Sequence, residues 1–221
     1  MQDPQQLNLY AYTRNNPLKY IDPTGMWIDT SQLSGEDYRK WRKIVELANQ
    51  KDDKGNYVNK DLHTAYTLID RDDRAFVLQN TPMEGAVGKF DIMEFSGDKD
   101  FSKASIQIDF RGAERINSVT PANFVPGFNK FEGILNNRTA KLAEAFGHEF
   151  GHAIYAIFNA AEEVSFRMLA TEIKADTARV RAPYPPDVIE KIERNLKYYV
   201  KTEQYSQQVE QLINGNLRAQ D

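Results

Sequence analysis

The sequence contains no cysteine, and it has no long apolar run. The absence of cysteine excludes a disulfide scaffold, a thiol nucleophile and a cysteine-type zinc finger. The longest wholly apolar segment runs only from Ala153 to Phe158, whereas a membrane-spanning helix needs roughly 20 such residues. The first residues lack a basic region followed by an apolar stretch, so no secretory signal is expected. We therefore expect no membrane insertion of this chain.

The charge balance also limits the classes of partner. There are 28 Lys and Arg against 32 Asp and Glu, which gives a net charge of −4, and we expect no nucleic-acid partner from this balance. Hydrophobic residues make up 41% of the 221 residues, enough for a folded core. This length predicts one compact domain with a short additional segment.

The spacing of apolar residues predicts helices and strands in a definite order. Helical spacing occurs in residues 34–50, 139–159, 162–180 and 187–213. Strand-like runs occupy residues 65–70, 74–80, 88–95 and 105–110, and residues 112–136 have the composition of a long loop. Because a helix is followed by strands and then by more helices, the expected fold class is α+β.

Histidine is scarce, yet two of the three histidines lie close together in the segment His148-Glu149-Phe150-Gly151-His152. On a helix, positions i and i+4 point the same way, so both imidazoles can bind one metal ion. The intervening Glu149 borders such a site and can take a proton from water. This pattern predicts a Zn²⁺ hydrolase site. The remaining histidine, His63, is expected to be a partly buried structural residue.

Gly151 stands inside this predicted helix, where glycine costs roughly 1 kcal/mol relative to alanine. Either the close approach of another element or of substrate, or simple helix packing, would explain it. A catalytic zinc also needs a third protein ligand. Glu162 and Glu163 are candidates for that ligand, but they fall at the expected turn between two helices.

The segment from 139 to 176 resembles the zincin metallopeptidases. The metzincin extension is missing, because Tyr155 and Phe158 stand at its Gly and His positions. Glu172 and Asp176 instead match the spacing of thermolysin-like gluzincins. That resemblance implies that Glu172 is the third zinc ligand and that Asp176 orients a ligating histidine, His148 being the expected one.

The same resemblance implies a zincin-like fold, with a small mixed sheet and a helix that carries the HExxH motif. In such folds an edge strand lies above that helix and pairs with substrate, and residues 105–110 are the candidate strand. No histidine follows His152, so the hydrogen-bond donor to the oxyanion is left open. The candidates for oxyanion or substrate contacts are Tyr155, Arg179, Arg181, Tyr184, Tyr198 and Tyr199.

The N-terminal residues carry a different resemblance. Residues 3–25 contain Asn15-Asn16-Pro17 and Asp22-Pro23-Thr24-Gly25, and they resemble the end of the conserved core of Rhs/YD-repeat proteins. In that family a repeat shell precedes a variable C-terminal domain that is often a toxin. The resemblance implies a shell remnant at residues 1–25 and an effector domain at residues 26–221. It also implies a parent Rhs shell, a cognate immunity protein, and secretion or delivery into a target cell.

Taken together, the motifs predict a zinc-dependent endopeptidase that cleaves a protein of a target cell. Glu149 is expected to take a proton from the attacking water and to pass it to the leaving amine. Two alternatives stay open: a zinc-dependent amidase or other hydrolase of a non-protein substrate, and a non-catalytic binding module stabilised by metal.

Overall fold

The structure is a computed structural model, and it describes residues 28–114, 138–180 and 182–218. The predicted Rhs remnant at residues 1–25, most of the predicted loop at 112–136, and Arg181 lie outside the described residues. None of the described helices combines the length and the apolar composition that crossing a bilayer requires. The elements, in chain order, are α1 (Gly35–Asn49), α2 (Lys60–Asp70), β1 (Ala75–Asn80), β2 (Gly88–Phe95), β3 (Phe101–Ile108), α3 (Phe110–Ala113), α4 (Arg138–Phe158), α5 (Ala160–Arg179) and α6 (Pro186–Arg218).

Four predicted helices are confirmed as α1, α4, α5 and α6, but one predicted strand is wrong. At the start of α1 the Ser34 side chain caps the helix, because it accepts a hydrogen bond from the Asp37 amide. Residues 65–70 form the second half of α2 instead of a strand. Short apolar runs do not distinguish the two states by periodicity, and here Leu62, Ala65 and Ile69 are buried along one side of a helix.

The three strands form one mixed sheet, in the order β1-β3-β2. β1 and β3 are parallel, whereas β2 and β3 are antiparallel. The fold class is therefore α+β with a small mixed sheet, as predicted. The expectation that residues 105–110 form the edge strand is wrong, because β3 is the central strand and ends at Ile108. The chain then continues into α3, whose first amides donate to the Asp109 side chain.

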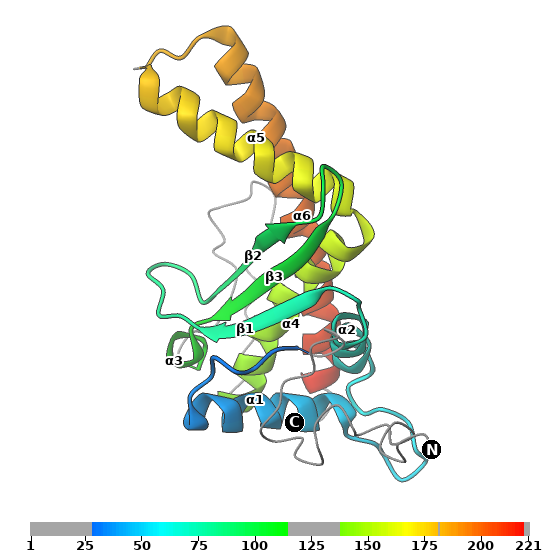
Figure 1. The fold of residues 1–221 in the computed structure, drawn as a ribbon. Helices are drawn as coiled ribbons and strands as arrows, with labels where there is room; N and C mark the ends of the chain where they lie inside the picture. The colour runs from blue at the N-terminus through cyan, green and yellow to red at the C-terminus, as the bar shows by residue number, and fades with distance from the viewer. Residues whose placement is uncertain (1–27, 115–137, 181, 219–221) are drawn as a thin grey trace, which may run out of the picture.

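α4 lies behind the sheet, with α1, α2 and α6 around it (Figure 1). Fifteen of its 21 residues are buried, so this helix forms the centre of the molecule rather than a surface element. Its Phe146 and Phe150 contact Trp41 of α1, at ring-centroid distances of 5.0 and 6.3 Å. This aromatic cluster fixes the orientation of α4 about its axis, and thereby the direction in which the HExxH residues point.

α6 runs antiparallel to α4 and lies very close to it. Asn214 donates to Glu144 near one end of the pair, and His152 contacts Glu203 near the other. A Cβ atom at Gly151 would lie 2.5 Å from the Cα atom of Ser206, so only glycine permits this approach. The first part of α6 continues beyond α4 and forms, with α5, an arm that projects from the body (Figure 1).

Candidate metal centre

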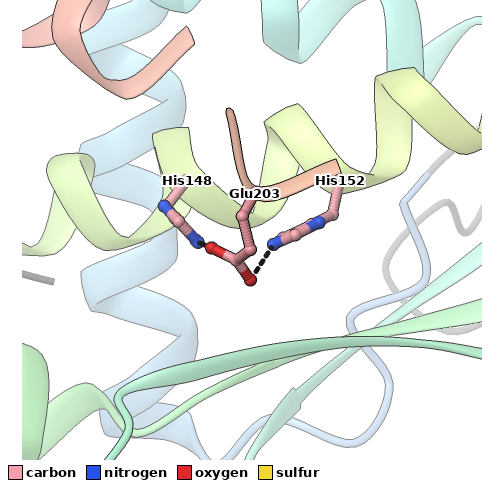
Figure 2. Close-up of side chains that lie close together, drawn as sticks. All are labelled: His148, His152 and Glu203. Atoms are coloured by element: carbon pink, nitrogen blue, oxygen red, sulfur yellow. Dashed lines mark ion pairs between the residues drawn. The ribbon is translucent and has the colours of Figure 1, made fainter. Parts of the chain in front are cut away.

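His148 and His152 face the same side of α4 and converge on one carboxylate (Figure 2). Nε2 of His148 lies 3.5 Å from Oε2 of Glu203, and Nε2 of His152 lies 3.3 Å from Oε1. The three ligand atoms, one from each residue, all lie within 4.8 Å of one another. Two imidazoles and one carboxylate are a donor set that zinc takes in catalytic sites, so this group could hold a metal ion.

The third residue of this group differs from the sequence-based expectation. Glu172 is 61% exposed and forms an ion pair with Lys191 at 3.4 Å. Because α5 leads from the end of α4 out along the projecting arm, Glu172 lies on that arm instead of over the histidines. The carboxylate that the structure places beside His148 and His152 is that of Glu203, on α6.

The orienting residue also differs from the expectation. Asp176 pairs with Lys191 at 2.8 Å on the arm. Nδ1 of His148 instead lies 2.8 Å from Oε2 of the buried Glu210, which is two helical turns beyond Glu203 on α6. A carboxylate that holds one ring nitrogen of a histidine fixes the tautomer and leaves the other nitrogen to a metal. Glu210, and not Asp176, thus contacts the ring nitrogen of His148 that the orienting residue was expected to hold.

The other two candidate carboxylates have partners elsewhere. Glu162 pairs with Lys201 at 2.9 Å and accepts a hydrogen bond from the Tyr155 hydroxyl. Glu163 is buried, and it accepts from the Tyr198 hydroxyl at 2.6 Å and from Nε of Arg167 at 2.7 Å. Neither belongs to the group around His148 and His152.

His148 and Glu203 shift each other's pKa values in opposite directions. Burial favours the neutral form of His148, but its hydrogen bonds with Glu203 and Glu210 outweigh burial and hold the pKa of this imidazole well above its usual value. Burial opposes ionisation of Glu203 as well, yet contacts with both histidines hold the pKa of its carboxyl far below the usual range. Because ligands must lose protons to bind a metal ion, metal binding at this group would compete with protonation of His148.

Glu149 lies beside this group with an incompletely satisfied carboxylate. Glu149 is only 3% exposed, and its Oε2 atom has no hydrogen-bond partner among the described residues. Burial raises the pKa of this carboxyl, although the neighbouring His152 and His148 oppose the rise. A Cβ atom at Gly88 would lie 2.6 Å from Cγ of Glu149, so the first residue of β2 rests directly against this side chain.

A cleft of about 320 Å³ opens at the group. The chain from Gly85 to Phe90 lines one wall, and Phe166, Arg167 and Tyr199 line another. Among the predicted contact residues that the structure describes, only Tyr199 lines this cleft. Tyr155 and Tyr198 donate to Glu162 and Glu163, as described above, and Arg179 and Tyr184 lie outside the lining. Arg181 is outside the described residues.

The Tyr199 hydroxyl is close to the group that could hold metal. Burial raises the pKa of this phenol, and the hydrogen-bonded Glu203 carboxylate raises it further. Tyr199 therefore keeps its proton and can donate it in a hydrogen bond. His63, by contrast, stacks on Tyr57 at 3.4 Å in another part of the molecule, and burial lowers the pKa of its ring.

A weak signal for Glu203 and Glu210 is present in the sequence. The two residues share one face of α6 with Ser206 and Ile213, both of which are completely buried. Acidic side chains on a buried helix face need a partner, because an uncompensated charge there is costly. This face could have been matched to the two histidines, but the long separation along the chain hides the pairing.

Comparisons of the chain with models of known protein families, with curated proteins and with solved structures find no match.

Proposed function

We propose that this chain is a zinc-dependent endopeptidase with a zincin-like arrangement of its active site. The observation that carries the proposal is the convergence of both Nε2 atoms of the HExxH motif on Glu203, beside the Oε2 atom of Glu149, which has no hydrogen-bond partner among the described residues. A buried ion-pair cluster alone would account for the histidines and Glu203. It would not explain why Oε2 of Glu149, a residue of the cleft wall, lacks a hydrogen-bond partner in the part of the chain that the structure describes.

The residues present fit a zinc ion. His148 and His152 would hold it through Nε2, and Glu203 through its carboxylate. Zinc bound in such a site supplies Lewis acidity, which polarises a substrate carbonyl and makes water a nucleophile at neutral pH. Glu210 would keep Nδ1 of His148 protonated, so that Nε2 stays available.

Two side chains of the cleft would carry the proton and the developing charge. Glu149 is placed to accept the proton of the attacking water and to return it to the leaving amine, and its raised pKa matches a group that must do both. Tyr199 lines the same cleft and keeps its hydroxyl proton, and it would turn this proton from Glu203 to the scissile carbonyl oxygen as negative charge develops there.

The sheet provides a place for a peptide. β2 is an edge strand, and its first residues line the cleft beside Glu149. An extended substrate can add to such an edge as a further strand, with its backbone held by main-chain hydrogen bonds. This supports a peptide substrate over a small amide. The role predicted for residues 105–110 thus passes to β2.

The biological setting is proposed from the N-terminal residues. Their resemblance to the end of an Rhs core supports an effector or toxin domain that is secreted or delivered into a target cell, with a protein of that cell as substrate. The parent shell and a cognate immunity protein would be its partners. Expressing the parent chain and sequencing the N-terminus of any released fragment tests the boundary after Gly25.

The experiment that tests the catalytic proposal uses the wild-type protein and Glu149→Gln, each loaded with zinc. Glu149 is a proton carrier and not a ligand, so the variant should retain one zinc while hydrolysis of casein falls by roughly 10²–10⁴-fold, the range for a general base. Arg179→Gln, on the arm, is the control and should keep full activity.

Two other results would favour the alternatives. Zinc-loaded protein that cleaves no protein or peptide, but hydrolyses amides in a screen of cell-wall fragments, would indicate an amidase. Fresh protein that contains no metal and gains no activity when zinc is added would contradict catalysis and favour a binding module.

A further inference from the structure

The exposed edge of β2 offers few backbone groups beside Glu149. Gly88 and Phe90 lie opposite Ile108 and Ile106 of β3. The Ile108 carbonyl accepts from Thr81 on the side of β3 away from β2, and the Val87 carbonyl accepts from Asp109. In an antiparallel ladder this alternation directs the backbone groups of Gly88 and Phe90 away from β3. These are the groups that an added peptide strand would use.

Arg167 of α5 already occupies one of them. Its Nη2 donates to the Phe90 carbonyl at 3.1 Å, and its Nη1 donates to Oδ1 of Asp91 at 2.8 Å. Its Nε donates to Glu163 at 2.7 Å, and Glu163 is itself held by Tyr198. The guanidinium thus has three acceptors in fixed directions, and one of them belongs to Glu163, a residue that is only 4% exposed.

We infer that Arg167 ends the substrate-binding edge of β2 at Phe90, so that the site recognises the peptide mainly on one side of the cleaved bond. The inference rests on the proposed peptidase function. Gly88 abuts Glu149, and Phe90 lies roughly 7 Å further along the strand. A peptide can therefore pair with the outward backbone groups of Gly88 and continue along the cleft wall formed by residues 85–87, whereas on the Phe90 side its backbone meets a carbonyl that already accepts from Arg167.

The consequence is an asymmetric dependence on peptide length. Every second residue added on the open side can gain backbone hydrogen bonds, each worth roughly 2–10-fold in affinity. Residues added on the Arg167 side leave the strand and gain little. If Arg167 only fastened α5 to the sheet, its replacement would lower stability and leave the length dependence unchanged.

The test uses acetylated and amidated peptides from a casein sequence, lengthened one residue at a time toward either end. For each, kcat/KM is measured with the wild-type protein, and Kd with zinc-loaded Glu149→Gln. The same ratios between long and short peptides are measured after Arg167→Met and after Arg167→Lys, which keeps a charge for Glu163 and Asp91. Arg179→Met, on the same helix, is the matched control. Ratios within one protein cancel any loss of folded material.

In the wild type, we expect lengthening on the open side to raise kcat/KM and affinity, and lengthening on the Arg167 side to change both by less than twofold. In the two Arg167 variants, we expect lengthening on the Arg167 side to raise them by roughly 2–10-fold. Equal gains toward both ends in the wild type would overturn the inference, as would an asymmetry that persists unchanged in both variants. Peptides that bind with this asymmetry but are never cut would keep the inference and contradict the peptidase. Peptides that neither bind nor are cut would contradict both.

Discussion

Glu203 and Glu210 act on His148 from opposite ring nitrogens, and both come from α6. Glu203 faces Nε2 at 3.5 Å and Glu210 faces Nδ1 at 2.8 Å. A single helix thus supplies the carboxylate that would bind the metal and the carboxylate that holds the imidazole in position. The two residues should therefore differ in what their loss does to metal affinity.

Glu210→Ala should weaken zinc binding by roughly 10–100-fold, the usual cost of losing a group that orients a ligand. Glu210→Gln should restore part of that loss, because its amide oxygen can accept the same hydrogen bond. Asp176→Ala should bind zinc as the wild type does, since Asp176 pairs with Lys191 on the arm. Competition titration against a chromogenic chelator measures all three. A loss in Asp176→Ala that matches the loss in Glu210→Ala would contradict this assignment.

Gly88 is the residue whose substitution should act on Glu149 alone. Its backbone does not have the positive φ that calls for glycine at Gly55, Gly85 and Gly97. A Cβ atom there would lie 2.6 Å from Cγ and 2.7 Å from Cδ of Glu149. Gly88→Ala should therefore displace that carboxylate and lower kcat by roughly 10²-fold, up to the full effect of losing the base.

The zinc affinity of Gly88→Ala should stay within about threefold of the wild type, because the three atoms nearest to the added Cβ all belong to Glu149 and none belongs to His148, His152 or Glu203. Gly85→Ala has open space around its Cβ but a strained backbone, and it separates a local backbone effect from displacement of Glu149. Equal losses of kcat in both variants would show that room beside Glu149 is not the reason for glycine at position 88.

The sequence predicted part of the site because local spacing determines it. Two histidines four positions apart on a helix must share a face, so His148 and His152 could be paired from the sequence alone. The third carboxylate depends on how separate helices pack. Glu172 had the expected spacing, but its position follows from the direction in which α5 leaves α4. Spacing along the chain carries no information on that angle.

At the scale of elements, the contact between α4 and α6 decides which carboxylate meets the histidines. Gly151 lets the backbone of α6 approach at Ser206, one turn from Glu203. The sequence indicated that some element or substrate could approach this glycine, and the structure identifies α6. The prediction of a strand at residues 65–70 is wrong for a similar reason. A short apolar run fits a strand or a helix equally well, and packing in three dimensions decides which side of α2 is buried.

Gly151→Ala should destabilise the protein, although alanine is favoured in an isolated helix by roughly 1 kcal/mol. Its Cβ would lie 2.5 Å from a backbone atom of α6, which must then move, at a cost of roughly 1–3 kcal/mol. Gly215→Ala, in α6, has open space and should instead raise stability by up to about 1 kcal/mol. Urea unfolding of both variants measures the difference. A Gly151→Ala variant as stable as Gly215→Ala would contradict the close helix contact.

For the whole molecule, the proposed zinc ion would join two helices that are distant in the sequence. α4 lies in the centre of the fold behind the sheet, while α6 extends from the body into the projecting arm (Figure 1). A metal held by both would stabilise the native state, because the unfolded chain does not bring His148, His152 and Glu203 together. The overall α+β class could be predicted from element order, whereas this long-range connection could not.

The measurement that tests the central claim most directly is a zinc titration, followed by thermal unfolding, of the wild type, Glu203→Ala and Glu172→Ala. The wild type and Glu172→Ala should bind one zinc with equal affinity. Zinc at about 100 times Kd should stabilise both by roughly 2.7 kcal/mol, or about 5–10 °C in Tm, and a chelator should reverse the shift. Glu203→Ala should lose more than the roughly 100-fold in affinity that an outer partner costs, and its Tm should not respond to zinc. Normal zinc binding by Glu203→Ala, together with its loss in Glu172→Ala, would contradict the account.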